Sequence, residues 1–232
     1  MNNNAIKLPF HFSEELLLND LKYCKSLEFV KHYSTDNYVG NWNSISLRSI
    51  DGLPQNIKAF DPMNDNWVDT YLLDHCFYFK EIIDLFKCDK YAIRLLNLAP
   101  NSRIKEHTDH NLGYSDGVFR VHVPIATNNR VQFVIGGAQV PMRVGECWYG
   151  DFNVSHSVCN LGNTERVHLT MDCKRNEWSD SMFKNSGYDF DLENKIEIYD
   201  DVTKRSMIAS LQEMDTDVAR ALIIKLQNEL RE

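Results

Sequence analysis

The feature that most constrains the fold of this chain is a series of short apolar segments that recur about every ten residues in its middle part. The series starts with a largely apolar run at residues 91–99 and continues with six further segments separated by Asn and Gly turns: 118–125, 131–135, 139–144, 147–150, 156–161 and 166–173. Short strands at such regular spacing are typical of β-sandwiches and barrels. The sequence therefore predicts a mainly β protein of jelly-roll type, with core strands over about residues 91–173.

Helical and loop patterns precede this predicted box. Ser13 followed by Glu14 and Glu15 is typical of a helix start. The apolar stripe of that helix would be Leu16, Leu17, Leu21 and Cys24. Residues 42–48 alternate like a strand, residues 54–66 favour a loop, and residues 71–87 place aromatic and leucine side chains at helical spacing. We therefore expect helices that flank the box on its N-terminal side.

Beyond Trp178 the strand pattern stops and an amphipathic helical pattern replaces it. Its apolar residues are spaced by three or four: Met207, Leu211, Met214, Val218, Leu222 and Leu226. Asp215-Thr216-Asp217 offers a new N-cap, so we expect a break there. We expect a β domain over residues 1–178, including the N-terminal helices, and a helical appendage over residues 179–232. The apolar stripe either covers the box or forms a homodimer with a second copy, and both interpretations stay open.

The overall composition excludes several classes of protein. The chain has 232 residues and a formal net charge of −8, which argues against a nucleic-acid-binding surface built from clustered Lys and Arg. No apolar run approaches the ~18 residues of a membrane span, and the N-terminus lacks the pattern of a secretory signal. We therefore expect a cytoplasmic protein without a membrane partner. Its six cysteines show no CxxC spacing, so we expect buried free thiols rather than a zinc site.

Five of the eight histidines lie between residues 107 and 168, and two of them belong to a candidate metal site. His107 and Asp109 are two residues apart, so on an extended chain their side chains project from the same face. His156 supplies a second imidazole. Two imidazoles and one carboxylate, with the opposite metal positions open, form the facial triad of non-haem Fe(II) oxygenases. The His-x-Asp pair alone is a weak signal, since a loop histidine capped by a carboxylate gives the same letters.

A second signal comes from the last predicted strand. Its alternation places Arg166, His168 and Thr170 on one face and apolar residues on the other. An arginine that faces the inside of a β-box is costly unless it meets an anion. A carboxylate co-substrate would satisfy the guanidinium group with two parallel hydrogen bonds. The two signals together predict a metal site with a carboxylate-binding arginine beside it.

Several motifs follow one another between residues 94 and 172: His107-Thr108-Asp109, Arg120-Val121-His122-Val123-Pro124, the Gly145-Glu146 turn, His156-Ser157-Val158-Cys159-Asn160 and Arg166-Val167-His168-Leu169. This stretch resembles the aspartyl/asparaginyl β-hydroxylase family, and residues 42–52 look like the upstream segment of its bacterial members. The family consists of 2-oxoglutarate- and Fe(II)-dependent dioxygenases on a cupin-like double-stranded β-helix. The resemblance therefore implies this fold, with Fe(II), 2-oxoglutarate and O₂ taking part in the reaction.

The resemblance also implies roles for single residues. His107, Asp109 and His156 resemble the iron ligands of the catalytic site. Some members, notably the animal enzymes that act on protein domains, have glycine at the position of Asp109. Because this chain keeps the full triad, it is placed nearer the bacterial small-molecule branch.

Three further residues resemble the co-substrate site. Arg166 is similar to the arginine that binds the distal carboxylate of 2-oxoglutarate, and His122 to a residue that contacts this co-substrate. Arg120 is expected to hold either the co-substrate or the acidic end of an amino-acid substrate. The family has a polar residue on the strand before His-x-Asp, where this chain has Leu96.

Other residues are weaker candidates. Arg48, Arg94 and Trp42 are candidate substrate-binding residues, although strand-end ion pairs would explain the arginines and a place in the core would explain the tryptophan. Four more residues are expected not to bind the metal, the two acids among them orienting neighbouring groups or capping strands: His110, Asp151, His168 and Asp172.

The predicted function follows from these residues and the resemblance. We expect a dioxygenase that hydroxylates an unactivated carbon of an amino acid, free or in a small peptide. One alternative is a hydroxylase of Asp or Asn residues in a protein partner, although the short N-terminal region leaves little room for a substrate groove. Another is a non-catalytic cupin-type protein that binds a metal or a small molecule, which would not require Arg166 to face inward.

Overall fold

The computed structural model describes residues 2–64, 66–193, 200–214 and 216–230. The chain divides into two compact units, Met1–Asp189 and Phe190–Glu232. Helix α3 (Glu177–Asn185) spans the domain boundary predicted from the sequence and lies in the first unit. The prediction that the C-terminal segment is a separate domain stays a prediction.

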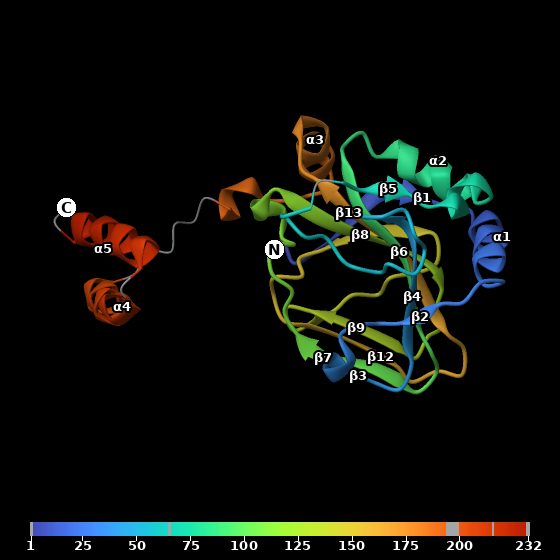
Figure 1. Ribbon diagram of the computed structural model, residues 1–232, viewed down its shortest axis with the longest axis horizontal. Helices are drawn as coiled ribbons and strands as arrows, with labels where there is room; N and C mark the ends of the chain where they lie inside the picture. The colour runs from blue at the N-terminus through green and yellow to red at the C-terminus, as the bar shows by residue number, and fades with distance from the viewer. Residues whose placement is uncertain (1, 65, 194–199, 215, 231–232) are drawn as a thin grey trace. The chain divides into compact units, whose positions relative to one another are not determined.

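Two antiparallel sheets face each other in the first unit (Figure 1). The strands of the larger sheet are β1 (Ala5–His11), β2 (Val30–Lys31), β4 (Trp42–Ser49), β5 (Val68–Asp69), β6 (Lys90–Leu98), β8 (Val118–Ala126), β11 (Glu146–Gly150) and β13 (Arg166–Lys174). Those of the smaller sheet are β3 (Tyr38–Val39), β7 (Ser102–His107), β9 (Val131–Ile135), β10 (Ala138–Gln139) and β12 (His156–Asn160). Their orders are β1-β11-β8-β13-β6-β4-β2, with β5 beside β4, and β10-β9-β12-β7-β3. This is the predicted double-stranded β-helix.

The helices of the first unit lie on the outer side of the larger sheet (Figure 1). They are α1 (Glu14–Cys24), α2 (Phe77–Leu85) and α3. Short 3-10 helices occur in this unit at Thr35–Asn37, Tyr71–Asp74 and Tyr114–Asp116, and another, Phe190–Leu192, begins the second unit. Helix α1 begins as predicted, because the Ser13 hydroxyl accepts a hydrogen bond from the backbone N–H of Leu16. Its stripe buries Leu17 and Leu21, whereas Leu16 is 43% exposed and does not belong to it.

The single helix predicted over residues 71–87 is wrong in one respect, because the chain breaks it between Asp74 and Phe77. Cys76 has φ −102° and ψ 71°, which is not helical. The carboxylate of Asp20, in α1, accepts the backbone N–H of Phe79 at 2.8 Å and so caps the second helix from outside. A cap supplied by a residue so far away in the sequence leaves no local signal.

The strand predicted over residues 139–144 is mostly wrong, since β10 ends at Gln139. Pro141 has no N–H to donate to a ladder, which ends the pairing soon after it begins. The turn before this strand is confirmed: Gly136 and Gly137 have φ of 56° and 77° and connect β9 to β10. Strands β1 and β7 were not predicted.

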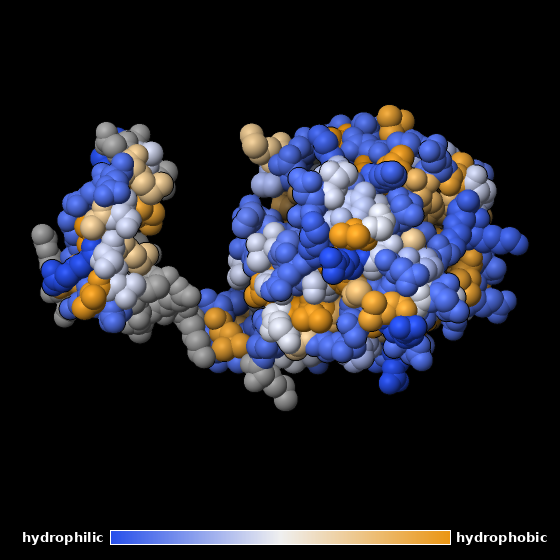
Figure 2. Space-filling model, turned by 90° about the horizontal axis from the view of Figure 1, so that it is seen from below, coloured by the Kyte–Doolittle hydropathy of each residue, from blue (hydrophilic) through white to orange (hydrophobic). Residues whose placement is uncertain are grey.

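The second unit consists of α4 (Asp201–Met214) and α5 (Asp217–Glu229), which pack together. The predicted break is present: Thr216 is the N-cap of α5 and accepts the backbone N–H of Ala219, while Asp215 lies outside the described residues. Apolar side chains remain on the surface of this unit (Figure 2), among them Leu222 and Ile224, which are 42% and 59% exposed. Within the described part of the chain, no helix has the length and apolar character that a membrane crossing requires.

The two sheets are tied together by a buried amide at the end of β12. Asn160 is fully buried, and its Nδ2 donates to the carbonyl of Leu98, the last residue of β6, at 3.1 Å and to the carbonyl of Thr164 at 2.9 Å. Its Oδ1 accepts from Asn128 Nδ2 and from the backbone N–H of Gly162, each at 3.1 Å. One side chain thus hydrogen-bonds to four polar groups and connects strands of the two sheets.

Replacing this amide should therefore destabilise the fold. Asn160→Ala leaves several buried donors and acceptors without partners, and we expect a loss of about 2–4 kcal/mol in the free energy of unfolding. Chemical denaturation of the variant and the wild type measures this loss. The matched control is Asn129→Ala at a neighbouring exposed position, for which we expect a change within about 0.5 kcal/mol. Equal stability of the two variants would contradict the proposed tie between the sheets.

Candidate active site

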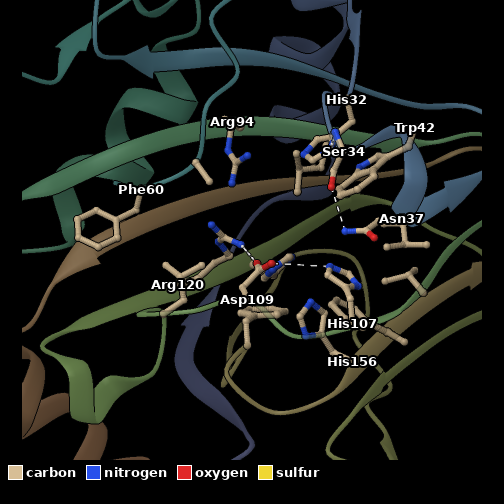
Figure 3. Close-up of a pocket in the computed structure, with 18 of the residues that line it drawn as sticks. His32, Ser34, Asn37, Trp42, Phe60, Arg94, His107, Asp109, Arg120 and His156 are labelled. Atoms are coloured by element: carbon tan, nitrogen blue, oxygen red, sulfur yellow. Dashed lines mark hydrogen bonds and ion pairs between the residues drawn. The ribbon is translucent and has the colours of Figure 1, made fainter. Parts of the chain in front are cut away.

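The three predicted metal ligands lie together between the sheets. His107 ends β7 and His156 begins β12, and the strand register pairs them directly, with ring centroids 4.2 Å apart. Asp109 follows on a loop that is fixed by a hydrogen bond from its N–H to the carbonyl of Phe152. The ligand atoms of the three residues lie within 4.8 Å of one another (Figure 3). One face of a metal ion could therefore be bound by all three.

The hydrogen bonds of these residues leave the right atoms free for a metal. Nδ1 of His107 lies 2.8 Å from the carbonyl of Lys105, and Nδ1 of His156 lies 3.0 Å from the carbonyl of Val154. A carbonyl only accepts, so each Nδ1 carries a proton, and Nε2 is the ring nitrogen left to bind a metal. Burial lowers the pKa of His156 to about 4, which keeps this imidazole neutral.

The carboxylate of Asp109 also keeps one oxygen atom available for a metal. Oδ2 of Asp109 accepts a hydrogen bond from Arg120 Nη1 at 3.0 Å, which leaves Oδ1, 3.8 Å from His107 Nε2, for the metal. Two imidazoles and one carboxylate with open positions opposite are the donor set of non-haem Fe(II) sites. The residues present therefore fit Fe(II).

A buried carboxylate holds the arginines of the site. Asp172 is fully buried and accepts two hydrogen bonds from Arg120, at 2.5 and 2.9 Å. It also lies 3.8 Å from Arg94 and accepts the backbone N–H of Phe60 at 3.1 Å. Burial raises the pKa of Asp172, but the charges and hydrogen bonds of Arg120, Arg94 and Phe60 outweigh this and hold it below the ordinary value. Asp172 is therefore ionised and connects both arginines to the loop that carries Phe60.

The cavity also contains a buried arginine that meets no carboxylate among the described residues. Arg166 is 1% exposed and lines the same cavity as His107, Asp109 and His156. In the described part of the chain, no carboxylate pairs with it: Nη2 donates to His168 Nδ1 at 2.8 Å, and Nε has no partner. Burial lowers its pKa to about 9, so the group is still charged at neutral pH. An uncompensated buried guanidinium favours binding of an anion at this point.

The remaining wall of the cavity is flat and aromatic, and it carries another arginine. Trp42 stacks on His32 with ring centroids 3.5 Å apart, and burial lowers the pKa of His32 to about 3, which keeps it neutral. Arg94 is 2% exposed and donates to the carbonyl of Ile57 at 3.3 Å, while its Nε has no partner. Figure 3 shows Arg94 and Trp42 across the cavity from the metal-ligating residues. No pattern in the sequence indicated that His32 belongs to this wall.

Nearly all sequence-predicted site residues line one cavity of about 270 Å³: His107, Asp109, His156, Arg120, His122, Arg166, Arg94 and Trp42. Leu96 lines it as well. Arg48 does not; it pairs with Asp69 at 2.5 Å and donates to the carbonyl of Lys90. The register of β4 and β6 shifts by one residue after the pair Ser46 and Arg94, so that Arg48 lies opposite Ile93, the residue next to Arg94. A one-residue shift turns a side chain to the other face of a sheet, which explains why Arg48 leaves the cavity.

Arg120 has two anionic partners in the protein, the carboxylates of Asp109 and Asp172. It therefore links a candidate metal ligand to the buried core. A direct contact with co-substrate or substrate stays a prediction.

Removing the charge of Asp172 should destabilise the fold. Asp172→Asn leaves Arg94 and Arg120 buried without a full counter-charge, so we expect a loss of about 3–5 kcal/mol near neutral pH. The folded pKa of Asp172 is depressed, so its contribution is complete above the unfolded value of about 3.9 and is lost as the pH falls through the folded pKa. Denaturation of both proteins across this range should show the difference shrinking below about pH 4. A difference that grows in acid would contradict this assignment.

Comparison with known proteins agrees with this geometry. Residues 14–176 match the family described as aspartyl/asparaginyl beta-hydroxylase. An L-proline cis-4-hydroxylase of Rhizobium meliloti (strain 1021) is 25% identical over 215 residues, which cover 91% of this chain and 71% of the relative.

Two solved structures share the fold at a TM-score of 0.50 each. One is the non-haem alpha-ketoglutarate-dependent epimerase SnoN from nogalamycin biosynthesis, 12% identical over 74% of this chain and 78% of its own. The other is an oxidoreductase of the 2OG-Fe(II) oxygenase family from Burkholderia pseudomallei, 13% identical over 75% of this chain and 86% of its own. The double-stranded β-helix is thereby confirmed. Since the family match also spans well over half of the sequence, this protein belongs to the aspartyl/asparaginyl β-hydroxylase family.

Proposed function

We propose that this protein hydroxylates an unactivated carbon of an amino acid, free or in a small peptide, with Fe(II), 2-oxoglutarate and O₂. The observation that carries the proposal is Arg166, a buried cation that meets no carboxylate among the described residues and lines the cavity of the candidate metal triad. A metal-binding box alone gives no reason to bury such a charge. Family membership supports the same enzyme class.

The charge balance of the site suits two carboxylate ligands. Among the described residues of the site, three guanidinium groups, those of Arg94, Arg120 and Arg166, face two carboxylates, those of Asp109 and Asp172. A divalent metal adds further positive charge. The site therefore has an excess of positive charge at its centre, although the whole chain carries a net charge of −8. Dianionic 2-oxoglutarate and the carboxylate of an amino acid would offset this excess.

Each part of the cavity has a distinct task in this proposal. His107, Asp109 and His156 would hold Fe(II), which together with 2-oxoglutarate supplies the chemistry that activates O₂. Arg166 binds and orients the distal carboxylate of the co-substrate. Arg120 keeps Asp109 turned so that one oxygen remains available. The apolar walls exclude water from the reacting centre: Leu96, Phe133, Phe152 and Val158.

The substrate side favours a small amino acid. A volume of about 270 Å³ lies at the lower end for ligand pockets, so it suits small molecules. Arg94 offers an incompletely paired guanidinium group to a substrate carboxylate, and the stacked Trp42 and His32 offer a flat surface to an aliphatic or cyclic side chain. The relative from Rhizobium meliloti is named for L-proline, which therefore heads the list of substrates to test.

Three finer expectations belong to the proposal. A homodimer through the C-terminal helices is favoured by the exposed apolar residues of that unit, such as Leu222 and Ile224. A cytoplasmic location stays a prediction from the sequence. We favour a small-molecule partner over a protein partner because of the limited size of the cavity.

The direct test combines binding and turnover. Anaerobic mixing with Fe(II) and 2-oxoglutarate should give the visible charge-transfer band of a co-substrate-bound facial-triad iron, and succinate formation should rise with one member of an amino-acid panel. His107→Ala should lose both signals, because one of three ligands is gone. His110→Ala, at an exposed position near the cavity, is the matched control and should keep the band. No band with the wild-type protein would refute the enzyme proposal.

The role of Arg166 has its own test. Arg166→Met removes the charge but keeps an elongated side chain, so we expect the KM for 2-oxoglutarate to rise at least tenfold, the equivalent of about 1.5–3 kcal/mol for a charged hydrogen bond. Arg166→Lys keeps a charge without the two-pronged geometry and should lie between. Initial rates of succinate formation at varied 2-oxoglutarate measure this. An unchanged KM in Arg166→Met would show that the carboxylate binds elsewhere.

A further inference from the structure

A second buried histidine lies directly behind the arginine of the co-substrate site. His168 is 1% exposed and, two positions after Arg166 on β13, faces the same side of the strand. Its Nδ1 lies 2.8 Å from Arg166 Nη2 and 3.2 Å from Nδ1 of His122, on the neighbouring strand β8. All three side chains are almost completely buried. The sequence predicted that His168 shares a strand face with Arg166 and is not a metal ligand, but it did not indicate their contact.

The donors and acceptors among Arg166, His168 and His122 can be assigned one after the other. A guanidinium group only donates, so His168 Nδ1 must be an acceptor, and the proton of neutral His168 sits on Nε2. If His122 Nδ1 also lacked a proton, two lone pairs would face each other at 3.2 Å. His122 therefore carries its proton on Nδ1 and shares the same acceptor. Its Nε2 then carries a lone pair. This atom is buried, and no group of the described residues hydrogen-bonds to it.

The groups around His122 favour its neutral form. Besides His168, positive charge from Arg166, Arg120 and Arg94 acts on it, and the imidazole of His156 disfavours its protonation further. Its other ring neighbours are the apolar Phe133 and Phe152. Burial, followed by these charges, lowers the pKa of His122 well below its ordinary value. The buried ring therefore has one proton, and the partner of that proton is His168.

We propose that His168 is a positioning residue that fixes one N–H of Arg166 and holds His122 in its Nδ1–H form. This inference rests on the proposed function and refines it. Recognition of the co-substrate carboxylate is assigned to Arg166, and His168 fixes the orientation of its guanidinium group.

The first test determines by NMR which ring nitrogen of each histidine is protonated, and it does not require enzyme activity. Long-range ¹H–¹⁵N spectra of the ¹⁵N-labelled protein, without added iron, report which ring nitrogen of each histidine is protonated. His122→Gln and His168→Asn spectra assign the signals. We expect His122 to be protonated on Nδ1 and His168 on Nε2 near neutral pH. A proton on Nε2 of His122, or on Nδ1 of His168, overturns the proposal.

The second test separates positioning from a general loss of structure. His168→Leu removes the acceptor, and we expect the KM for 2-oxoglutarate to rise about tenfold while the KM for the amino-acid substrate stays within about twofold. His168→Asn is the matched control, because its Oδ1 places an acceptor where Nδ1 was, and it should restore most of the affinity. Equal changes in both KM values, or no rescue by Asn, overturn the positioning role.

The experiments distinguish a failure of the proposed function from a failure of the role proposed for His168. Absence of 2-oxoglutarate turnover in the wild-type protein would refute the proposed function, and the spectra would still decide the assignment of protons. If His168→Leu does not fold, the spectra of the wild type decide it as well.

Discussion

The structure depends on charged side chains that are enclosed between two sheets and compensate one another. Asp172 holds Arg120 with two hydrogen bonds, and Arg120 in turn holds Asp109. Removing water from such groups is costly, so the network persists only because each charge meets another with good geometry. The same chain of contacts fixes the carboxylate that would bind the metal. Stability of the box and geometry of the site are therefore properties of one network.

The strand register brings the two halves of the site together. Asp172 lies opposite Arg120 in the larger sheet, and His156 lies opposite His107 in the smaller one. Because directly opposed residues of an antiparallel pair share a face, the fold itself pairs the ion network with the metal ligands across the cavity. Arg166 differs from the other buried charges, since its contacts among the described residues are a neutral imidazole and an aromatic ring rather than a carboxylate. In the proposed function, this imbalance favours the binding of an anion in the cavity.

Local patterns were enough to predict much of this arrangement. Strand alternation placed Arg166 inside the box, and the spacing of His107 and Asp109 placed both on one side of the metal site. Features set by distant residues were not predictable: the break before α2 depends on Asp20, and the outward direction of Arg48 depends on a register shift. The partners of Asp172 and His168 come from other strands, so no spacing in the sequence reveals them. Pro141, by contrast, was a local signal against a strand over 139–144.

The measurement that tests the central claim most directly is a crystal structure of the protein grown without oxygen in the presence of Mn(II) or Fe(II) and 2-oxoglutarate. The account predicts a metal bound by His107, Asp109 and His156, a co-substrate whose distal carboxylate meets Arg166, and an Arg120 that still spans Asp109 and Asp172. A metal bound elsewhere, or a carboxylate that leaves Arg166 without an anion, would contradict it.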